Sequence, residues 1–195
     1  SRRQRQMCIR DRLESEDTVM IIGSGALGSS ILRIVKLYNP KAIIVTDIDD
    51  AKLEEAKKNG ATYTINSLKE DVPAKAHELT EGYGPTVTID AACVKGSLLT
   101  ALQATGNAGR VITMGFSVAP TEVNQFVITS KELDVRGSRL QNRKFQDVID
   151  LVNEGKVDLR GSISHTWNFE DAQAAFDFVD SRDPSYRKGV LTFKK

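Results

Sequence analysis

Three glycines, Gly23, Gly25 and Gly28, interrupt an apolar stretch with the spacing G-x-G-x-x-G. The run TVMII before them is typical of a buried strand, and ALGSSILRIVKLYN after them has the apolar spacing of a helix. At such a junction the first glycine permits a tight turn, the second lets the backbone approach a pyrophosphate, and the third allows the helix to pack on the strand. Because free amides and the helix dipole favour an anion there, the stretch predicts a dinucleotide pyrophosphate site.

A carboxylate follows at the distance that this kind of site requires. Asp47 lies nineteen positions after Gly28, at the end of the apolar run AIIVTD. It is placed to accept hydrogen bonds from the adenosine ribose and to repel a 2′-phosphate. Two like charges about 4 Å apart cost roughly 4 kcal/mol at an effective dielectric constant near 20, so we expect NAD rather than NADP. Lys52 could reach the adenosine end, and a solvated helix face explains it equally well.

The elements that must position these groups alternate regularly up to about residue 140. Continuous apolar runs predict strands and amphipathic runs predict helices. We expect strands at 18–22, 42–47, 61–66, 86–92, 109–115 and 133–139, and helices at 26–39, 50–60, 69–84, 96–105 and 126–132. Such alternation indicates βαβ units with right-handed crossovers and helices on both faces of a parallel sheet. The predicted class is α/β, a doubly wound Rossmann fold with a six-stranded parallel sheet.

The pattern changes near Asn142, where the βαβ repeat stops. A helix at 144–155 with an apolar face, a strand at 162–167, a helix at 168–179 and a strand at 188–193 predict a C-terminal α+β segment. We expect Asn168 to cap the second of these helices and Phe176 to be buried beneath it. The first residues are basic and aperiodic. The expected divisions are an extraneous or disordered leader at 1–12, a nucleotide-binding domain at 13–140 and a separate segment at 141–195.

Composition argues against several classes of partner. Apolar residues make up 40% of the chain, charged residues 27%, and the formal net charge is +1, which is ordinary for a globular protein and predicts no nucleic-acid or membrane partner. No apolar run approaches the roughly 20 residues that cross a bilayer, and no signal-peptide pattern is present. The cysteines Cys8 and Cys93 do not suggest a disulfide framework, so we expect a cytoplasmic protein.

Candidate metal ligands are scattered along the sequence. Cys8, Cys93, His77 and His165 show neither C-x-x-C nor H-E-x-x-H spacing, whereas a catalytic zinc requires three protein ligands and an open position. We therefore predict no metal site in this chain. Both histidines are expected to be structural, and Cys93 is expected to be a small buried side chain beside the cofactor.

From Leu13 onward the chain resembles the C-terminal half of medium-chain, zinc-type alcohol and polyol dehydrogenases. The segments that carry the resemblance are DTVMIIGSGALG, VTDIDDAKLEEAKKNGA, TIDAAC, GRVITMGF, DAQAAFDFV and KGVLTF. The runs DAAC, MGFSVAP and ITSKELDVRGSRLQNRKF are similar to the branch that oxidises sugar acids, of the L-galactonate or L-idonate 5-dehydrogenase kind. The resemblance implies hydride transfer from a secondary alcohol of a sugar acid or polyol to NAD.

The resemblance also implies, position by position, which residues hold the cofactor. Residues 23–28 would cradle the pyrophosphate, residues 91–92 would line the adenosine side, and residues 114–115 and 138–140 would approach the nicotinamide. With Lys52 added from its position after Asp47, the full set of candidate cofactor-binding residues comprises Gly23, Ser24, Gly25, Ala26, Leu27, Gly28, Asp47, Lys52, Ala91, Ala92, Met114, Gly115, Ser138, Arg139, Leu140 and Lys188. Three of these positions have a second interpretation. Met114 also fits a plain core residue, Lys188 a solvated lysine, and Arg139 either a substrate carboxylate or a structural ion pair.

In this family the catalytic zinc is held by an N-terminal β-rich domain, which residues 1–17 have no room to form. Zinc there would polarise the alcohol oxygen and lower its pKa. We therefore expect no catalytic residue in this chain, little activity from it alone, and zinc only in a full-length enzyme. The segment at 141–195 would be a remnant of that GroES-like catalytic domain. The resemblance further implies a homo-oligomer, a dimer or tetramer, with the strand at 133–139 as its pairing edge.

Two other functions use similar sequence features. A non-catalytic NAD-sensing regulatory domain would need the same nucleotide site. An adenosyl-methionine-dependent methyltransferase also has a glycine turn followed by an acidic residue, but it normally lacks the third glycine. A short-chain reductase is excluded, because no lysine stands four positions after any tyrosine of the chain.

Overall fold

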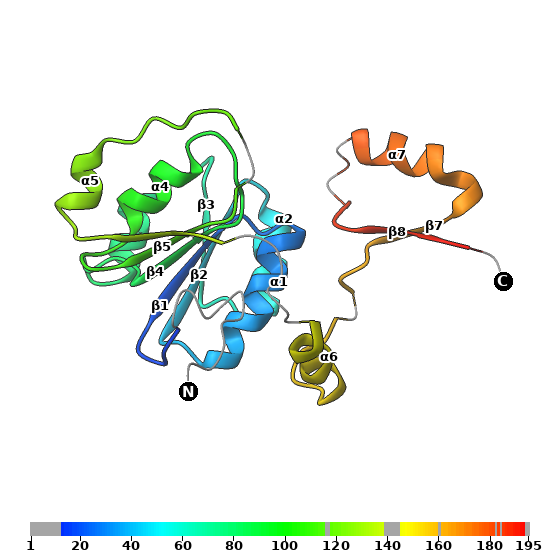
Figure 1. Ribbon diagram of the computed structural model, residues 1–195, viewed down its shortest axis with the longest axis horizontal. Helices are drawn as coiled ribbons and strands as arrows, with labels where there is room; N and C mark the ends of the chain where they lie inside the picture. The colour runs from blue at the N-terminus through cyan, green and yellow to red at the C-terminus, as the bar shows by residue number, and fades with distance from the viewer. Residues whose placement is uncertain are drawn as a thin grey trace. The chain divides into compact units, whose positions relative to one another are not determined.

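The computed structural model describes residues 13–115, 118–138, 145–159, 161–181, 183 and 185–193. The chain divides into two compact units, Ser1–Lys156 and Val157–Lys195, and each is described by itself (Figure 1). The predicted leader at 1–12 and the predicted boundary between residues 140 and 141 lie outside the described residues. The division into a leader and two domains therefore stays a prediction.

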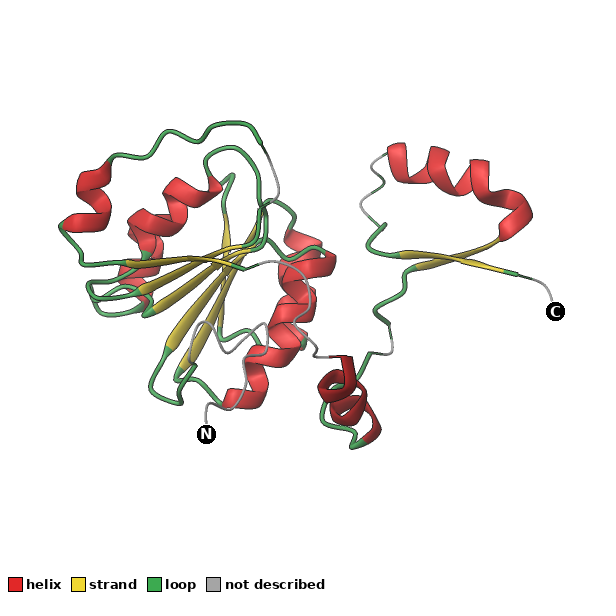
Figure 2. Cartoon of the chain, viewed as in Figure 1, coloured by secondary structure: helices red, strands yellow, loops and turns green. Residues whose placement is uncertain are grey.

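The first unit is built on a six-stranded parallel sheet in the order β3-β2-β1-β4-β5-β6 (Figure 2). Its strands are β1 (Thr18–Ile22), β2 (Ala42–Asp47), β3 (Tyr63–Asn66), β4 (Val87–Asp90), β5 (Arg110–Thr113) and β6 (Asp134–Gly137). The order reverses between β1 and β4, which is the topology of the doubly wound Rossmann fold and leaves a crevice at the carboxyl ends of these strands. The predicted α/β class and six-stranded parallel sheet are confirmed.

Helices cover both faces of this sheet. They are α1 (Ala26–Val35), α2 (Asp50–Lys58), α3 (Val72–Leu79), α4 (Ser97–Ala104) and α5 (Gln125–Thr129), with the 3-10 turn η1 (Lys36–Tyr38) after α1. Figures 1 and 2 show α1 and α2 on one side of the sheet and α4 and α5 on the other. Asp49 and Asp71 cap α2 and α3 by accepting hydrogen bonds from Ala51 N and Ala74 N.

Each face has its own core because alternate strand residues point to opposite sides. Ile21 and Val45 pack with Leu32 of α1 on one side, and Met20 and Ile44 belong to the core that includes α3 and α4 on the other. The strands are consequently buried on both faces, which explains their uninterrupted apolar sequences.

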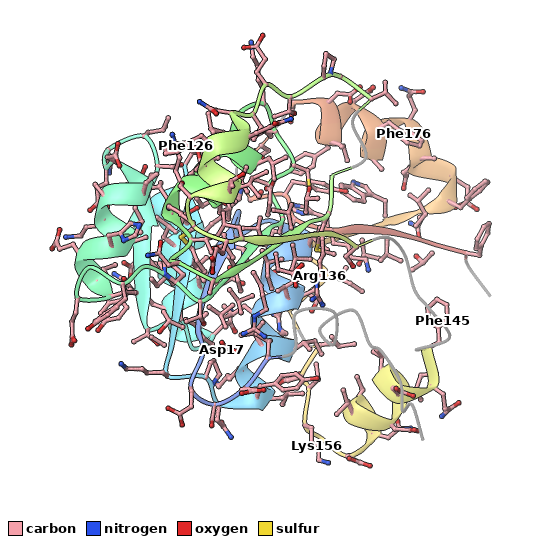
Figure 3. The ribbon with its side chains drawn as sticks, turned by 60° about the vertical axis from the view of Figure 1, so that its left-hand side comes forward. Asp17, Phe126, Arg136, Phe145, Lys156 and Phe176 are labelled. Atoms are coloured by element: carbon pink, nitrogen blue, oxygen red, sulfur yellow. The ribbon has the colours of Figure 1, made fainter. Side chains whose placement is uncertain are left out.

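A polar network ties the strands together at the edge opposite the crevice. The carboxylate of Asp17, which precedes β1 and is labelled in Figure 3, accepts hydrogen bonds from Thr86 Oγ1 at 2.7 Å and from Arg110 Nη2. Asp17 is buried, and its pairing with Arg110 compensates the charge. The amino ends of β1, β4 and β5 are thereby fixed in one register, and the carboxyl ends of the strands are left for the site.

Helix α6 (Phe145–Asn153) follows in the first unit and presents an apolar face to solvent. Phe145 and Ile149 are 67% and 48% exposed. Such side chains at helical spacing are typical of a surface that packs on something else.

The second unit consists of two parallel strands and the helix between them. They are β7 (His165–Asn168), the 3-10 turn η2 (Phe169–Asp171), α7 (Ala172–Asp180) and β8 (Gly189–Thr192). Its centre is aromatic: the ring of His165 stacks on Trp167, with centroids 5.4 Å apart, and lies 4.6 Å from that of Phe178.

Two expectations for this unit are wrong. The side chain of Asn168 makes no cap hydrogen bond, because the 3-10 turn intervenes before α7 begins. Phe176 is 63% exposed rather than buried, since α7 turns Ala175 inward and brings Phe178 onto the aromatic cluster (Figure 3). Among the described residues of both units, no helix has the length and apolar character needed to cross a bilayer.

Candidate functional site

The glycine turn joins β1 to α1, and its three glycines have three different physical roles. Gly23 has φ +92°, a conformation that L side chains rarely adopt, and a Cβ there would lie 3.0 Å from Ala92 Cα. A Cβ on Gly28 would lie 1.8 Å from the carbonyl oxygen of Gly23, so the helix can approach the turn only without a side chain. A Cβ on Gly25 would meet nothing within 4 Å. The backbone at Gly25 therefore faces open space.

Helix α1 begins beside that open space without a side-chain cap. Gly25 is its N-cap residue and makes no side-chain hydrogen bond to the first turn, and the first turn carries no acidic residue. The amides of Ala26 and Leu27 belong to this turn. An uncapped helix start of this kind has amide donors and a positive dipole end suited to an anion.

Asp47 is held next to the turn at the end of β2. Its Oδ2 accepts a hydrogen bond from Ser24 N at 2.7 Å, and its Oδ1 accepts one from Asp49 N at 3.1 Å. Gly23 N donates to the carbonyl of Thr46 at 2.8 Å, which secures the same two segments a second time. The carboxylate is only partly buried, so it can also accept hydrogen bonds from a ligand.

Lys52 brings a positive charge to the same place. Its Nζ lies 3.9 Å from Asp49 Oδ2, and its carbonyl oxygen lies 3.4 Å from the hydroxyl of Ser24. The side chain is 24% exposed. Lys52 therefore both lines the site and secures the start of α2 to the turn.

A cleft of about 680 Å³ opens at these residues, within the range of 300–1,000 Å³ usual for small-molecule sites. Of the predicted cofactor-binding residues, Gly23, Gly25, Asp47 and Lys52 line it together with residues 91–92. Sequence reasoning missed a further set, contributed by the β3–α3 connection, the first turn of α3, the β4–α4 connection and α4 itself: Ser67, Glu70, Asp71, Val72, Pro73, Val94, Lys95, Gly96, Ser97, Thr100 and Gln103. Their position after the carboxyl ends of β3 and β4 is the signal that could have found them.

The expected nicotinamide-side residues lie at the carboxyl ends of β5 and β6. Met114 is buried, and its amide donates to Asp90 O at 3.3 Å. A Cβ on Gly115 would lie 3.9 Å from Cys93 Sγ, and Ser138 N donates to Thr113 O at 2.9 Å. These residues stand beside one another on adjacent strands, although they are not among the residues that line the 680 Å³ cleft.

For three other expected positions the prediction is not tested by this cleft. Arg139 and Leu140 lie outside the described residues. Lys188 belongs to the second unit, where its carbonyl oxygen accepts a hydrogen bond from Ser164 N at 2.9 Å.

The candidate metal ligands have other surroundings. His77 Nδ1 lies 3.0 Å from the carbonyl oxygen of Gly82, beyond the end of α3, and His165 is part of the aromatic cluster. Cys93 is partly buried with φ +56°. Burial and the charge of Asp90 raise the pKa of the Cys93 thiol. Within the described ranges, no three side chains of His, Cys, Asp or Glu are grouped so that they could hold a metal ion.

Comparison with known proteins identifies the family of this chain. A family model described as zinc-binding dehydrogenase matches residues 26–154. The starvation-sensing protein RspB of Escherichia coli is 37% identical over 180 residues, which cover 92% of this chain and 52% of RspB. The erythritol/L-threitol dehydrogenase of Mycolicibacterium smegmatis is 27% identical over 93% of this chain and 51% of its own length.

Solved structures show the same correspondence. The crystal structure of RspB from E. coli CFT073, complexed with NADH, superposes with a TM-score of 0.86 and 35% identity, over 96% of this chain and 55% of that one. L-idonate 5-dehydrogenase of E. coli has a TM-score of 0.86 at 22% identity, over 96% and 53% of the two chains, and shows the shared fold. This chain thus spans about half the length of the curated relatives that it matches. It belongs to the zinc-binding dehydrogenase family.

Proposed function

We propose that this chain is the NAD-binding part of a dehydrogenase that oxidises a secondary alcohol of a sugar acid or polyol. The observation that carries the proposal is the open space at Gly25 near the carboxylate of Asp47, where both residues line a cleft of about 680 Å³. A bare Cα against open space fits close approach of a pyrophosphate, and a partly exposed carboxylate fits a ribose diol. When bound, NAD⁺ supplies the acceptor for the hydride.

The chain's own groups would bind and orient this cofactor. Amides in the first turn of α1, at residues 26–28, would donate hydrogen bonds to the pyrophosphate, and the helix dipole would favour its charge. Asp47 would accept hydrogen bonds from the ribose and exclude a 2′-phosphate by charge repulsion. Residues 91–92, 114–115 and 138–140 would line the path from adenosine to nicotinamide, and Lys188 would face the pyrophosphate.

Names of relatives and a local resemblance support the substrate class. The relatives include enzymes named erythritol/L-threitol, sorbitol and (R,R)-butanediol dehydrogenase, which are named for polyhydric alcohols. The preference for a sugar acid rests on the segments 90–93, 114–120 and 128–145, which resemble the sugar-acid branch. The chemistry also needs a zinc ion, and the side chains in the cleft do not form a tetrahedral ligand set for one. Zinc would therefore be held by another part of a longer protein, which we propose to be a cytoplasmic homo-oligomer.

Nucleotide titration tests the proposal. We expect NADH to give a saturable fluorescence change with this chain, and NADPH to bind at least about tenfold more weakly because of Asp47. A folded protein without a saturable NADH signal would contradict the proposal, and binding of adenosyl-methionine in its place would indicate a methyltransferase. A longer protein that contains this chain should oxidise an aldonate or polyol in a zinc-dependent manner. If that longer protein binds the nucleotide but oxidises neither substrate, the NAD-sensing alternative is favoured.

A further inference from the structure

Asp90 is a charged residue that the proposed cofactor contacts do not use. It ends β4 at the crevice edge of the sheet, yet only 2% of its surface is exposed. Its Oδ1 accepts a hydrogen bond from Cys93 N at 3.0 Å, and its Oδ2 accepts one from Ser97 Oγ at 2.7 Å. Both donors are neutral groups within the next seven residues. The carboxylate therefore holds the connection that follows its own strand.

That connection, residues 91–97, is a strained and closely bonded loop. Cys93 has φ +56° although it is not a glycine, and Gly96 has φ +88°. Ser97 Oγ, which donates a hydrogen bond to Asp90 Oδ2, also lies 2.8 Å from Val94 O and accepts a hydrogen bond from Val94 N at 3.2 Å. Holding Cys93 in the left-handed region is unfavourable unless the surroundings impose it. The hydrogen bond from its amide to Asp90 is such a constraint.

The same loop forms one wall of the cofactor cleft. Residues 91, 92 and 94–97 all line it, and they are the residues that follow Asp90 directly. Cys93, the member absent from the lining, is the residue whose amide Asp90 binds. Of the two residues that the carboxylate contacts, Cys93 is outside the lining and Ser97 is part of it. Asp90 therefore holds both the middle and the end of a loop whose other residues line the cleft.

We infer that Asp90 is a positioning residue for the cofactor, which fixes the 91–97 loop in the shape that admits the nucleotide. This inference rests on the proposed function. A buried carboxylate is expensive to desolvate, and an apolar side chain in its place is often neutral or stabilising in proteins. The loop geometry that Asp90 maintains accounts for a buried carboxylate directly before the residues that line the cleft.

Three variants of the full chain separate positioning from folding. Asp90→Ala removes both hydrogen bonds, and Ser97→Ala removes one. Asp90→Asn can keep both, because its amide oxygen accepts from Cys93 N while its amide NH₂ donates to Ser97 Oγ, whose own proton then goes to Val94 O. The matched control is Thr88→Val, which removes a fully buried hydroxyl of the same strand that lies 2.7 Å from Thr105 Oγ1, away from the cleft.

We expect Asp90→Ala to raise the Kd for NADH at least tenfold, and Ser97→Ala to raise it about threefold or more, at a temperature where circular dichroism shows folded protein. Asp90→Asn should bind within twofold of the parent and so rescue the loss. Thr88→Val should lower Tm and leave the Kd within twofold of the parent. In a Cys8→Ser background, iodoacetamide should alkylate Cys93 faster in Asp90→Ala than in Asp90→Asn. Both variants lack the charge that raises the pKa of the thiol, and only Asp90→Ala releases the backbone of Cys93.

Each outcome decides the matter. A folded Asp90→Ala variant with the parent's Kd would overturn the inference. It would also be overturned if Thr88→Val raised the Kd as much as Asp90→Ala does for the same loss of Tm. If Asp90→Ala fails to fold, Ser97→Ala decides. A raised Kd at the parent's Tm, with faster alkylation of Cys93, supports positioning. An unchanged Kd overturns the inference, and so does a raised Kd with the parent's alkylation rate, because Ser97 itself lines the cleft. If the parent protein gives no saturable NADH signal, the proposed function fails and this inference fails with it. If the parent binds NADH and the variants bind it with the same Kd, only the inference fails.

Discussion

The amide nitrogen of Ser24 lies 2.7 Å from Oδ2 of Asp47, so the glycine turn after β1 and the carboxylate after β2 form one hydrogen-bonded unit. A hydrogen bond from an amide to a charged carboxylate is stronger than one between neutral groups. The bond orients the carboxylate while the group stays partly exposed. Asp47 therefore fixes the shape of the turn, and the proposed function assigns it a second role, the choice of nucleotide.

The variant Asp47→Asn separates these two roles. The amide oxygen of asparagine can still accept the hydrogen bond from Ser24 N, so the turn should persist, while the negative charge is lost. We expect NADH to bind more weakly and the preference for NADH over NADPH to fall at least about tenfold, because repulsion of the 2′-phosphate disappears. Parallel fluorescence titrations with the two nucleotides measure the ratio. An unchanged ratio would show that Asp47 does not discriminate between them.

Two glycine variants distinguish fold from binding. In Gly28→Ala the new Cβ would lie 1.8 Å from the carbonyl oxygen of Gly23, and we expect a loss of about 2 kcal/mol or more in the free energy of unfolding. In Gly25→Ala the Cβ meets open space and φ is −69°, so stability should stay within about 0.5 kcal/mol of the parent. Urea denaturation measures both.

Binding should show the opposite pattern for Gly25→Ala. The added methyl group occupies the space that we assign to the pyrophosphate, so NADH should bind at least about tenfold more weakly although the fold is intact. Parental affinity in this variant would place the ligand elsewhere.

Much of the first unit was predictable because its signals are local. Uninterrupted apolar strands, helix caps such as Asp71, and the spacing of the glycines from Asp47 can each be read over a few residues. The far wall of the cleft was not, because Glu70 and Thr100 come together only when the crossovers place β3 and β4 on either side of β1 and β2. Asp90 was missed for a related reason: an aspartate at a strand end is usually exposed, and only the folded loop shows that Cys93 and Ser97 enclose it.

The second unit shows where a local signal misleads. The pattern predicted a helix that starts at Asn168 and buries Phe176, but a 3-10 turn occupies residues 169–171 and the α-helix starts at Ala172. Which side chains face inward is then decided by the aromatic cluster around His165, in which Phe178 and Tyr186 come from α7 and from the segment before β8.

Lys131 gives a test of stability in the first unit. Its Nζ donates hydrogen bonds to the carbonyl oxygens of Gln103 at 2.6 Å, Thr105 at 2.9 Å and Leu102 at 3.3 Å, at the end of α4. Burial lowers the pKa of this lysine, and the contacts with the helix end offset that cost. We expect Lys131→Met to reduce the free energy of unfolding by about 1–2 kcal/mol in urea denaturation.

The matched control for this variant is Lys57→Met. Lys57 Nζ lies 3.0 Å from Glu54 Oε1, and both side chains are at least half exposed, so its loss should cost less than about 0.5 kcal/mol. Equal effects of the two substitutions would contradict a capping role for Lys131.

The thiol of Cys93 gives a pH-dependent test of the loop beside the cleft. Burial, and then the charge of Asp90, raise the pKa of this thiol above its ordinary value of 9.0. Because only the thiolate is alkylated, the iodoacetamide rate of a Cys8→Ser protein should reach half its maximum above pH 9.0 when folded and near pH 9.0 in denaturant. Asp90→Asn should lower the folded midpoint, whereas Glu78→Gln, on an exposed face of α3, should leave it unchanged.

The same pKa fixes the direction of a stability change. Between pH 9.0 and the higher pKa of the folded state, the unfolded chain loses the Cys93 proton while the folded chain keeps it. The folded state therefore binds more protons, and the free energy of unfolding falls as the pH rises through this window. The contribution of the protonated Cys93 thiol to the free energy of unfolding is complete below pH 9.0 and is lost as the pH rises through the folded-state pKa. The difference in unfolding free energy between the Cys8→Ser protein and its Cys93→Ala derivative should shrink accordingly, and a constant difference from pH 8 to pH 10.5 would show that the thiol is not shielded.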